Sequence, residues 1–198
     1  MAQVVRKLAL GVTLSLSCVA CTSGGGSGFA HESPSGQFAQ LSRLKSIDSS
    51  EEQLITADEF PRKSQKPKVI GEVREGSYRL IAYIQGEFCG LRVAEAENSE
   101  RSLIHVTSAW PRSDSEESTP YPAGPYSFAS AAGSDGSRMW ASLGCSKLAM
   151  VINYSSQDHG PASDQRGDVS IKKHREDPAT LDVVIGSREA RARILPQV

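Results

Sequence analysis

The chain has 198 residues, a formal net charge of −1 and 38% hydrophobic residues. A domain of this length buries enough of its unfolded surface to be stable without a structural metal. The charge is close to zero and lacks the basic surplus that nucleic-acid-binding proteins carry, so the sequence predicts no nucleic-acid partner.

The N-terminus carries a targeting pattern. Arg6 and Lys7 precede an apolar stretch, Leu8–Ala20, and glycine and serine dominate soon after Thr22. A basic segment followed by a short apolar segment is typical of a secretory signal peptide. The stretch is shorter than the roughly 20 residues that cross a membrane as a helix. We therefore predict that residues 1–20 are a signal peptide that is removed.

The end of this stretch contains a lipidation pattern. Val19-Ala20-Cys21 resembles the cleavage box of bacterial lipoproteins, and the resemblance is limited to the signal region. It implies that Cys21 carries fatty acyl chains such as palmitate, becomes the mature N-terminus and anchors the protein to the extracytoplasmic side of the cell membrane or outer envelope. Cys18 stands where the box usually has leucine, and Ser15–Cys18 is a second candidate box. Signal cleavage without lipid and an N-terminal helix of a cytoplasmic protein are the alternatives.

Two further segments precede the predicted domain. Residues 21–37 are predicted to be the lipidated cysteine and a flexible tether, because glycine and serine chains are flexible. Residues 38–68 are predicted to be helical or a weakly ordered extension. Asp48, followed by Glu51 and Glu52, is a candidate N-cap for a second helix. Apolar residues recur at three-residue steps, as expected for a helix face, at Phe38, Leu41, Leu44 and Ile47.

Residues 69–198 are predicted to form a β-rich domain. Short runs rich in β-branched and aromatic residues are separated by turn residues such as Gly86-Glu87 and Gly133–Ser137. The strand Lys147–Tyr154 is predicted to be central because both of its faces are apolar. The predicted strands are Tyr78–Ile84, Phe88–Val93, Leu103–Trp110, Tyr126–Ser130, Met139–Leu143, Lys147–Tyr154, Val169–Lys172 and Leu181–Ile185.

The connecting segments complete the predicted fold. Pro111–Pro125 and Ser155–Asp168 are predicted to be long loops, and Ser187–Leu195 a short helix or an edge strand. The pattern predicts a mainly β fold, an antiparallel sandwich or partly closed barrel, with one or two short N-terminal helices. An α+β arrangement is the alternative. Strands do not alternate with long amphipathic helices, which argues against a doubly wound sheet.

The cysteines predict one disulfide bond. If Cys18 leaves with the signal peptide and Cys21 is lipidated, Cys89 and Cys145 remain, and both lie in an oxidising compartment. A bridge that closes a loop of about 57 residues destabilises the unfolded chain by roughly 4 kcal/mol in the chain-entropy model. Two buried thiols in separate strands are the alternative.

The sequence lacks the local motifs of common active sites and phosphate loops, and we predict no cofactor and no metal site. His105 lies among apolar strand residues and is interpreted as structural. Asp158–Asp168 has three carboxylates, for which a solvated loop is favoured over a Ca²⁺ site. Glu95 and Glu97 are predicted to be an exposed pair, and Lys172–Arg175 a solvated turn or strand end. The histidines lack metal-ligand spacing and are His31, His105, His159 and His174.

Two classes of function remain. The first is a membrane-anchored binding or envelope-associated module that meets a protein or small-molecule ligand with its surface loops. The second is a secreted hydrolase whose site combines His105, His159 and nearby acidic residues. We favour the first class, because catalysis generally needs a base that is held by a second group.

Overall fold

The computed structural model describes residues 39–48, 65–98, 101–110, 121–122, 124, 126–133, 136–157, 162–174 and 179–198. The predicted signal peptide, the lipidation site Cys21, the tether and the predicted helix after Asp48 lie outside the described residues. No helix among the described residues is long and apolar enough to cross a membrane.

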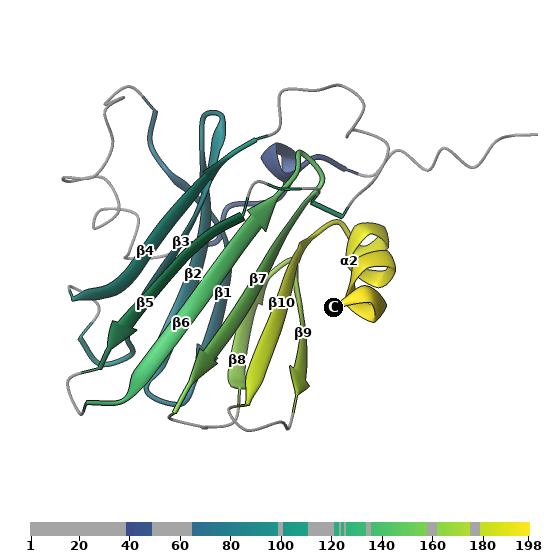
Figure 1. The fold of residues 1–198 in the computed structure, drawn as a ribbon. Helices are drawn as coiled ribbons and strands as arrows, with labels where there is room; N and C mark the ends of the chain where they lie inside the picture. Colours follow the sequence, from purple (N-terminus) through teal and green to yellow (C-terminus); the bar gives the residue numbers. More distant parts are fainter. Residues whose placement is uncertain are drawn as a thin grey trace, which may run out of the picture. The chain divides into compact units, whose positions relative to one another are not determined.

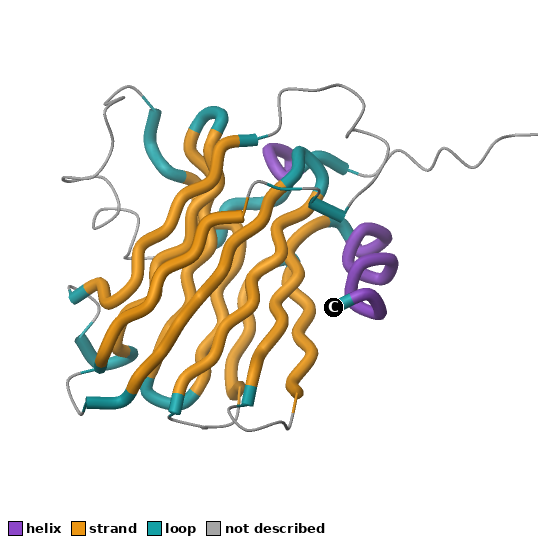
Figure 2. The backbone as a smooth tube through the Cα atoms, viewed as in Figure 1, coloured by secondary structure: helices purple, strands orange, loops and turns teal. Residues whose placement is uncertain are grey.

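The described residues form a sandwich of two antiparallel five-stranded sheets (Figures 1 and 2). In sheet A the order of strands is β4-β3-β2-β1-β8, and in sheet B it is β5-β6-β7-β10-β9. The prediction of a mainly β, antiparallel fold is confirmed, and the sandwich rather than the barrel is the form adopted. The strands are β1 (Lys68–Glu75), β2 (Tyr78–Gln85), β3 (Phe88–Glu95), β4 (Ser102–Ala109), β5 (Tyr126–Ala132), β6 (Arg138–Cys145), β7 (Ala149–Ser156), β8 (Ala162–Gly167), β9 (Val169–His174) and β10 (Thr180–Gly186).

Alternate side chains of each strand point inward, and those that meet between the sheets are mostly apolar. The core between the sheets contains Ile70, Leu80 and Leu91 of sheet A and Leu143 and Ile152 of sheet B, all fully buried. Strand β7 lies at the centre of sheet B, between β6 and β10, as its apolar faces predicted. Hairpin turns at Gly76 and Gly86 join β1, β2 and β3, and both glycines have a positive φ, which glycine adopts without steric cost.

Residues 39–48, the described start of the segment predicted to be helical or a weakly ordered extension, form no α-helix. Only a single 3-10 turn, η1 (Leu41–Arg43), forms, and the residues on either side of it, Gln40 and Leu44, are extended. Leu41 and Leu44 enter the core between the sheets, whereas Ile47 packs on the outer face of sheet A. The residues at this three-residue spacing therefore contact two different surfaces and do not form one face of a helix.

The loop predicted at Ser155–Asp168 is also wrong. Strand β7 continues to Ser156, and Ala162–Gly167 is strand β8, which pairs with β1 at the edge of sheet A. Asp164, Gln165 and Arg166 are exposed, so this strand has no apolar alternation that would reveal it. Gly167, with a φ of 87°, lets the chain cross from β8 in sheet A to β9 in sheet B.

The C-terminal segment, for which a helix or an edge strand was predicted, is the helix α2 (Arg188–Ile194), followed by the 3-10 turn η3 (Leu195–Gln197). The Ser187 side chain caps the helix by accepting a hydrogen bond from the backbone N–H of Ala190. Ala190 and Ile194 pack on Val151 and Val184 of sheet B. The helix thus covers one end of the outer face of this sheet (Figure 1).

The predicted disulfide bond is present. Cys89 of β3 and Cys145 of β6 are bridged, with their Cα atoms 6.6 Å apart, and both are fully buried. The bond therefore joins sheet A to sheet B inside the core.

Candidate functional site

The outer face of sheet B carries two parallel rows of polar and aromatic side chains. The registers of the four strand pairs place one residue of each strand directly opposite the next. The first row is Phe128, Ser142, Asn153, Asp182 and Lys172, in the order of the strands from β5 to β9. The second row is Ser130, Trp140, Ser155, Thr180 and His174. We call the two rows together the outer B face.

A chain of hydrogen bonds crosses the outer B face from β6 to β9. The Ser142 hydroxyl donates to Oδ1 of Asn153 at 3.0 Å. The Asn153 Nδ2 group donates to Oδ1 of Asp182 at 2.6 Å. The other oxygen of Asp182, Oδ2, is 2.5 Å from Nε2 of His174. Each strand thereby fixes the side-chain position on its neighbour, which holds the four groups in one arrangement.

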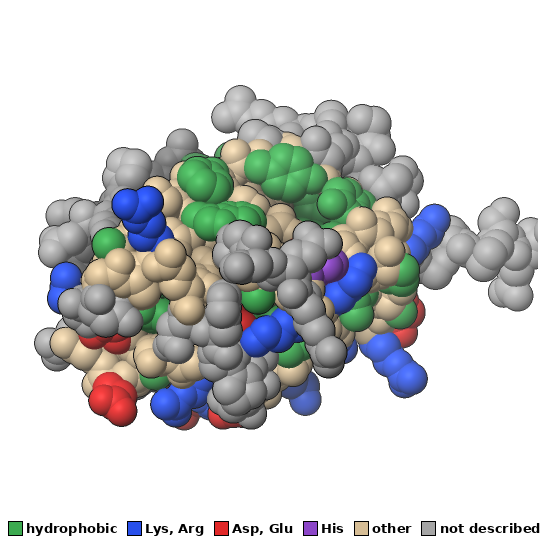
Figure 3. Space-filling model, turned by 60° about the horizontal axis from the view of Figure 1, so that its bottom comes forward, with side chains coloured by type: hydrophobic (Ala, Val, Ile, Leu, Met, Phe, Trp, Pro, Cys, Tyr) green, Lys and Arg blue, Asp and Glu red, His purple; other side chains and the backbone are tan. Residues whose placement is uncertain are grey.

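Aromatic residues lie on the outer B face beside the Ser142 end of this hydrogen-bonded chain. Phe128 is 65% exposed and stacks on Trp140, with ring centroids 5.9 Å apart and an angle of 29° between the rings. Tyr126, which is 50% exposed, and Phe128 are the exposed large hydrophobic residues of the described chain. Hydrophobic side chains also gather along the upper side of the space-filling view (Figure 3). The adjacent exposed rings make this end of the outer B face a candidate interaction surface.

The outer face of sheet A is different, because its polar groups are buried. Tyr83 is fully buried, and its hydroxyl is 2.5 Å from Nε2 of His105. Burial raises the pKa of Tyr83, an effect that the Arg92 charge opposes, and burial lowers the pKa of His105. The phenol is therefore protonated and the imidazole is neutral at pH 7, and the two groups share one hydrogen bond. Ile47 packs over this region against Val69, Ile81 and Tyr83.

Ion pairs complete the outer face of sheet A. Glu72 is buried and lies 2.9 Å from the Arg79 guanidinium and 3.6 Å from that of Arg166 on the edge strand β8. Glu75, also buried, lies instead on the inner face of sheet A, where it pairs with Lys173 of β9 at 3.0 Å and so links the two sheets. Removing one partner of a buried ion pair leaves the other charge buried and unpaired, which is strongly destabilising. These ion pairs therefore have a structural role.

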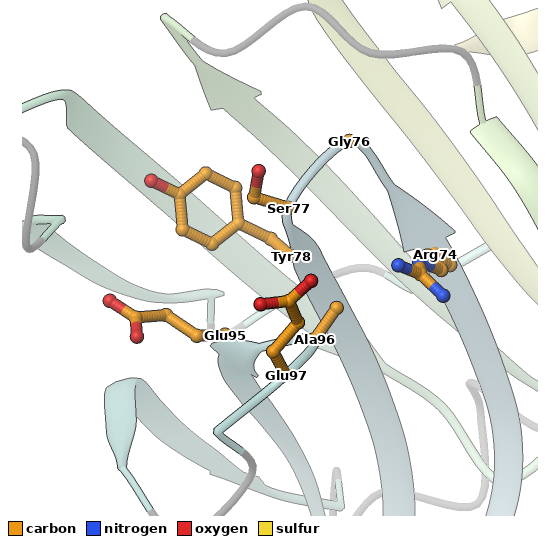
Figure 4. Close-up of a pocket in the computed structure, with 7 residues that line it drawn as sticks. All are labelled: Arg74, Gly76, Ser77, Tyr78, Glu95, Ala96 and Glu97. Atoms are coloured by element: carbon orange, nitrogen blue, oxygen red, sulfur yellow. The ribbon is translucent and has the colours of Figure 1, made fainter.

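A pocket of about 330 Å³ lies at the tip of the β1–β2 hairpin (Figure 4). The carboxylates of Glu95 and Glu97 lie on the Tyr78 side of the turn, and the Arg74 guanidinium lies beyond it (Figure 4). Glu97 is exposed, as predicted, but Glu95 is partly buried, and its Oε1 atom has no hydrogen-bond partner. The Tyr78 hydroxyl is engaged with Ser137 at 2.7 Å. The pocket lining thus combines two acidic groups with one basic group, that of Arg74.

The structure describes only part of the predicted hydrolase site. His105 lies on sheet A, and its neighbour Tyr83 is a buried phenol rather than a carboxylate. His159 and Asp158 lie outside the described residues. Asp168, the last acidic residue of the predicted loop, is 3.5 Å from the Arg191 guanidinium. Among the described residues, no group of three or more His, Cys, Asp or Glu side chains is placed to hold a metal ion.

Sequence reasoning missed the polar chain of the outer B face. A signal was present, since Asn153 lies between Ile152 and Tyr154 and Asp182 lies between Leu181 and Val183. A polar residue in such a strand marks the face that turns away from the core. The basic cluster does fall at a strand end, as predicted, and His174 within it is the terminal residue of β9.

Comparisons of this chain with family models, with curated proteins and with solved structures gave no match.

Proposed function

We propose that the chain is a membrane-anchored, extracytoplasmic lipoprotein whose β sandwich binds a saccharide on the outer B face. The observation that carries the ligand proposal is the continuity of the exposed Phe128–Trp140 stack with the hydrogen-bonded chain of Ser142, Asn153, Asp182 and His174. A sugar ring has an apolar C–H face that stacks on aromatic rings and hydroxyl groups that both donate and accept hydrogen bonds. The outer B face offers partners for both.

The rigidity of the face supports a binding role. Its polar side chains are held on four neighbouring strands, about 4.8 Å apart, and are joined by hydrogen bonds. A preformed surface loses little conformational entropy when the ligand arrives. The helix α2 covers the apolar end of the outer B face. The aromatic and polar part of this face is therefore the part that we propose binds the ligand.

The membrane anchor is supported by the signal-like segment and by Cys21 in the lipoprotein-like box. Intact-mass measurement of membrane-extracted protein should show that residues 1–20 are lost and that lipid is added. Stable anchoring needs more than one acyl chain, so Cys21→Ser should release the folded domain from the membrane. A soluble product with an unmodified Cys21 would refute the anchor.

Ligand binding is tested by the fluorescence of a single tryptophan. The chain has two tryptophans, so Trp110→Phe leaves Trp140 as the reporter on the outer B face. We expect saturable fluorescence changes with N-acetylglucosamine oligosaccharides or with maltooligosaccharides. Phe128→Ala should weaken binding at least about tenfold, the equivalent of 1.4 kcal/mol. Phe88→Ala on sheet A is the matched control and should bind normally. No saturable change with either series would overturn the saccharide proposal.

A further inference from the structure

The two lateral sides of the sandwich differ in charge. On one side the edge strands β8 and β9 carry exposed or partly exposed Asp164, Arg166, Lys172 and Lys173. On the other side the edge strands β4 and β5 contain no Lys, Arg, Asp or Glu. Charged side chains on an edge strand prevent it from pairing with another chain. Only the β8 and β9 side has this protection.

Strand β5 is one of these two uncharged edges, and on its inner face the Ser127 hydroxyl donates to the Thr107 carbonyl of β4. Among the described strands it pairs with β6 alone. Its seven residues alternate between exposed and partly buried positions, and they include no proline or glycine. On its free edge, alternate backbone N–H and C=O groups point away from β6, which is the arrangement that accepts a further strand.

The side chains of β5 are self-complementary. In an antiparallel pair of two β5 strands with full overlap, Ala129 lies opposite its own copy. Phe128 then lies opposite Ser130, and Tyr126 opposite Ala132, on the outer face. Each large aromatic residue thus faces a small residue, and the two-fold axis repeats each of these pairs. No like charges lie opposite each other. We propose that β5 pairs with β5 of a second copy of this chain and joins the two sheets B into one continuous sheet.

This pairing places the two outer B faces on the same side of the joined sheet. A two-fold axis perpendicular to a sheet preserves which face is outward, so the Phe128–Trp140 stacks of both copies lie beside the axis. If the proposed function holds, the dimer presents two adjacent sites to one polysaccharide, which raises its avidity. The pairing itself does not rest on the identity of the ligand.

A charge-swap experiment on the full chain in detergent solution tests the pairing. Ser130 is exposed on the outer face, and in the paired strands it lies diagonal to its own copy, within reach of long charged side chains. We expect the unaltered chain to sediment as a dimer in a concentration series. Ser130→Lys alone and Ser130→Glu alone should each sediment as monomers. An equimolar mixture of the two should restore the dimer.

Gln165→Lys, on the exposed edge strand β8, is the matched control and should leave the dimer intact. A chain that stays monomeric throughout the series would overturn the proposal. So would single Ser130 variants that remain dimeric, or a mixture that stays monomeric. No saccharide is present in this experiment, so its failure is distinct from failure of the proposed function.

Discussion

Two cross-strand tyrosine–glycine pairs, one on each sheet, differ in how their tyrosine is used. Tyr83 lies opposite Gly90 on sheet A, and Tyr126 lies opposite Gly144 on sheet B. In both pairs a Cβ atom on the glycine would overlap the tyrosine ring. Tyr83 is fully buried and bonded to His105, whereas Tyr126 is half exposed. The same packing of tyrosine on glycine therefore occurs on a buried face and on an exposed face. We call the outer face of sheet A the closed face and the outer B face the open face.

The disulfide bond lies directly behind both pairs. Cys89 precedes Gly90 in β3, and Cys145 follows Gly144 in β6, so each glycine faces outward where its neighbouring cysteine faces inward. The bridge therefore joins the closed face to the open face. Substitutions on the sheet A side should cost stability, and substitutions on the sheet B side should cost mainly binding.

The largest expected effect comes from removing the bridge itself. Cys89→Ala combined with Cys145→Ala should lower the free energy of unfolding by about 2–5 kcal/mol, because the unfolded chain regains conformational freedom. Denaturant unfolding of the oxidised chain and of the double variant measures this loss. An unchanged unfolding midpoint would show that the packing of the two sheets holds them without the bond.

The two glycines should differ in the cost of an added methyl group. Gly90→Ala should lower the free energy of unfolding by about 1–3 kcal/mol, since the buried Tyr83 ring cannot move aside. Gly144→Ala should cost less, because Tyr126 is half exposed and can turn into solvent. Denaturant unfolding of both variants gives the comparison directly. Equal costs would contradict the distinction between a closed and an open face.

The closed face should also respond to acid. Burial lowers the pKa of His105, so the unfolded chain binds a proton that the folded chain excludes. Stability from this group is present above the unfolded pKa of about 6.5 and is lost as the pH falls below it. His105→Gln keeps an acceptor for the Tyr83 hydroxyl but does not titrate.

The measurement for this prediction is urea unfolding of both proteins between pH 8 and pH 5, with Arg92 unchanged in each. The free energy of unfolding of the native chain should fall relative to that of His105→Gln as the pH decreases through this range. A difference that stays constant with pH would show that His105 keeps its ordinary pKa in the folded chain.

The smallest effect on stability is expected on the open face. Phe128→Ala removes a side chain that is 65% exposed, and such surface changes usually alter the free energy of unfolding by no more than about 0.5 kcal/mol. Thermal or denaturant unfolding of this variant is the check. A loss of several kcal/mol would mean that Phe128 is a structural residue and that the face is not open.

The fold class was predictable from the sequence because most strands alternate apolar and polar residues or are apolar throughout. Strands β2, β3 and β7 were placed within two residues of their observed ends. Strand β8 escaped prediction because its pairing depends on the backbone of β1, and its described side chains are polar and exposed. Backbone pairing at a sheet edge leaves no trace in hydropathy.

The candidate site was harder to predict, because its residues come from five strands that are not consecutive in sequence. Asn153 and Asp182 lie side by side only because β10 pairs with β7. That pairing follows from the packing of the whole sheet, and no local pattern specifies it. The cysteines were an exception, since a pair without a competitor has a single connectivity.

The position of the bridge also determines what a cut in the chain would do. The loop that it closes contains β4, β5 and the segment 111–120, and the two cysteines have a sequence separation of 56. Strands β1 to β4 precede that segment and belong to sheet A, and all strands of sheet B follow it. A protease that cut one peptide bond between 111 and 120 would therefore create a two-chain protein, with each chain carrying most of one sheet. On a denaturing gel the two chains would migrate as one species without reductant and as two species after the disulfide was reduced.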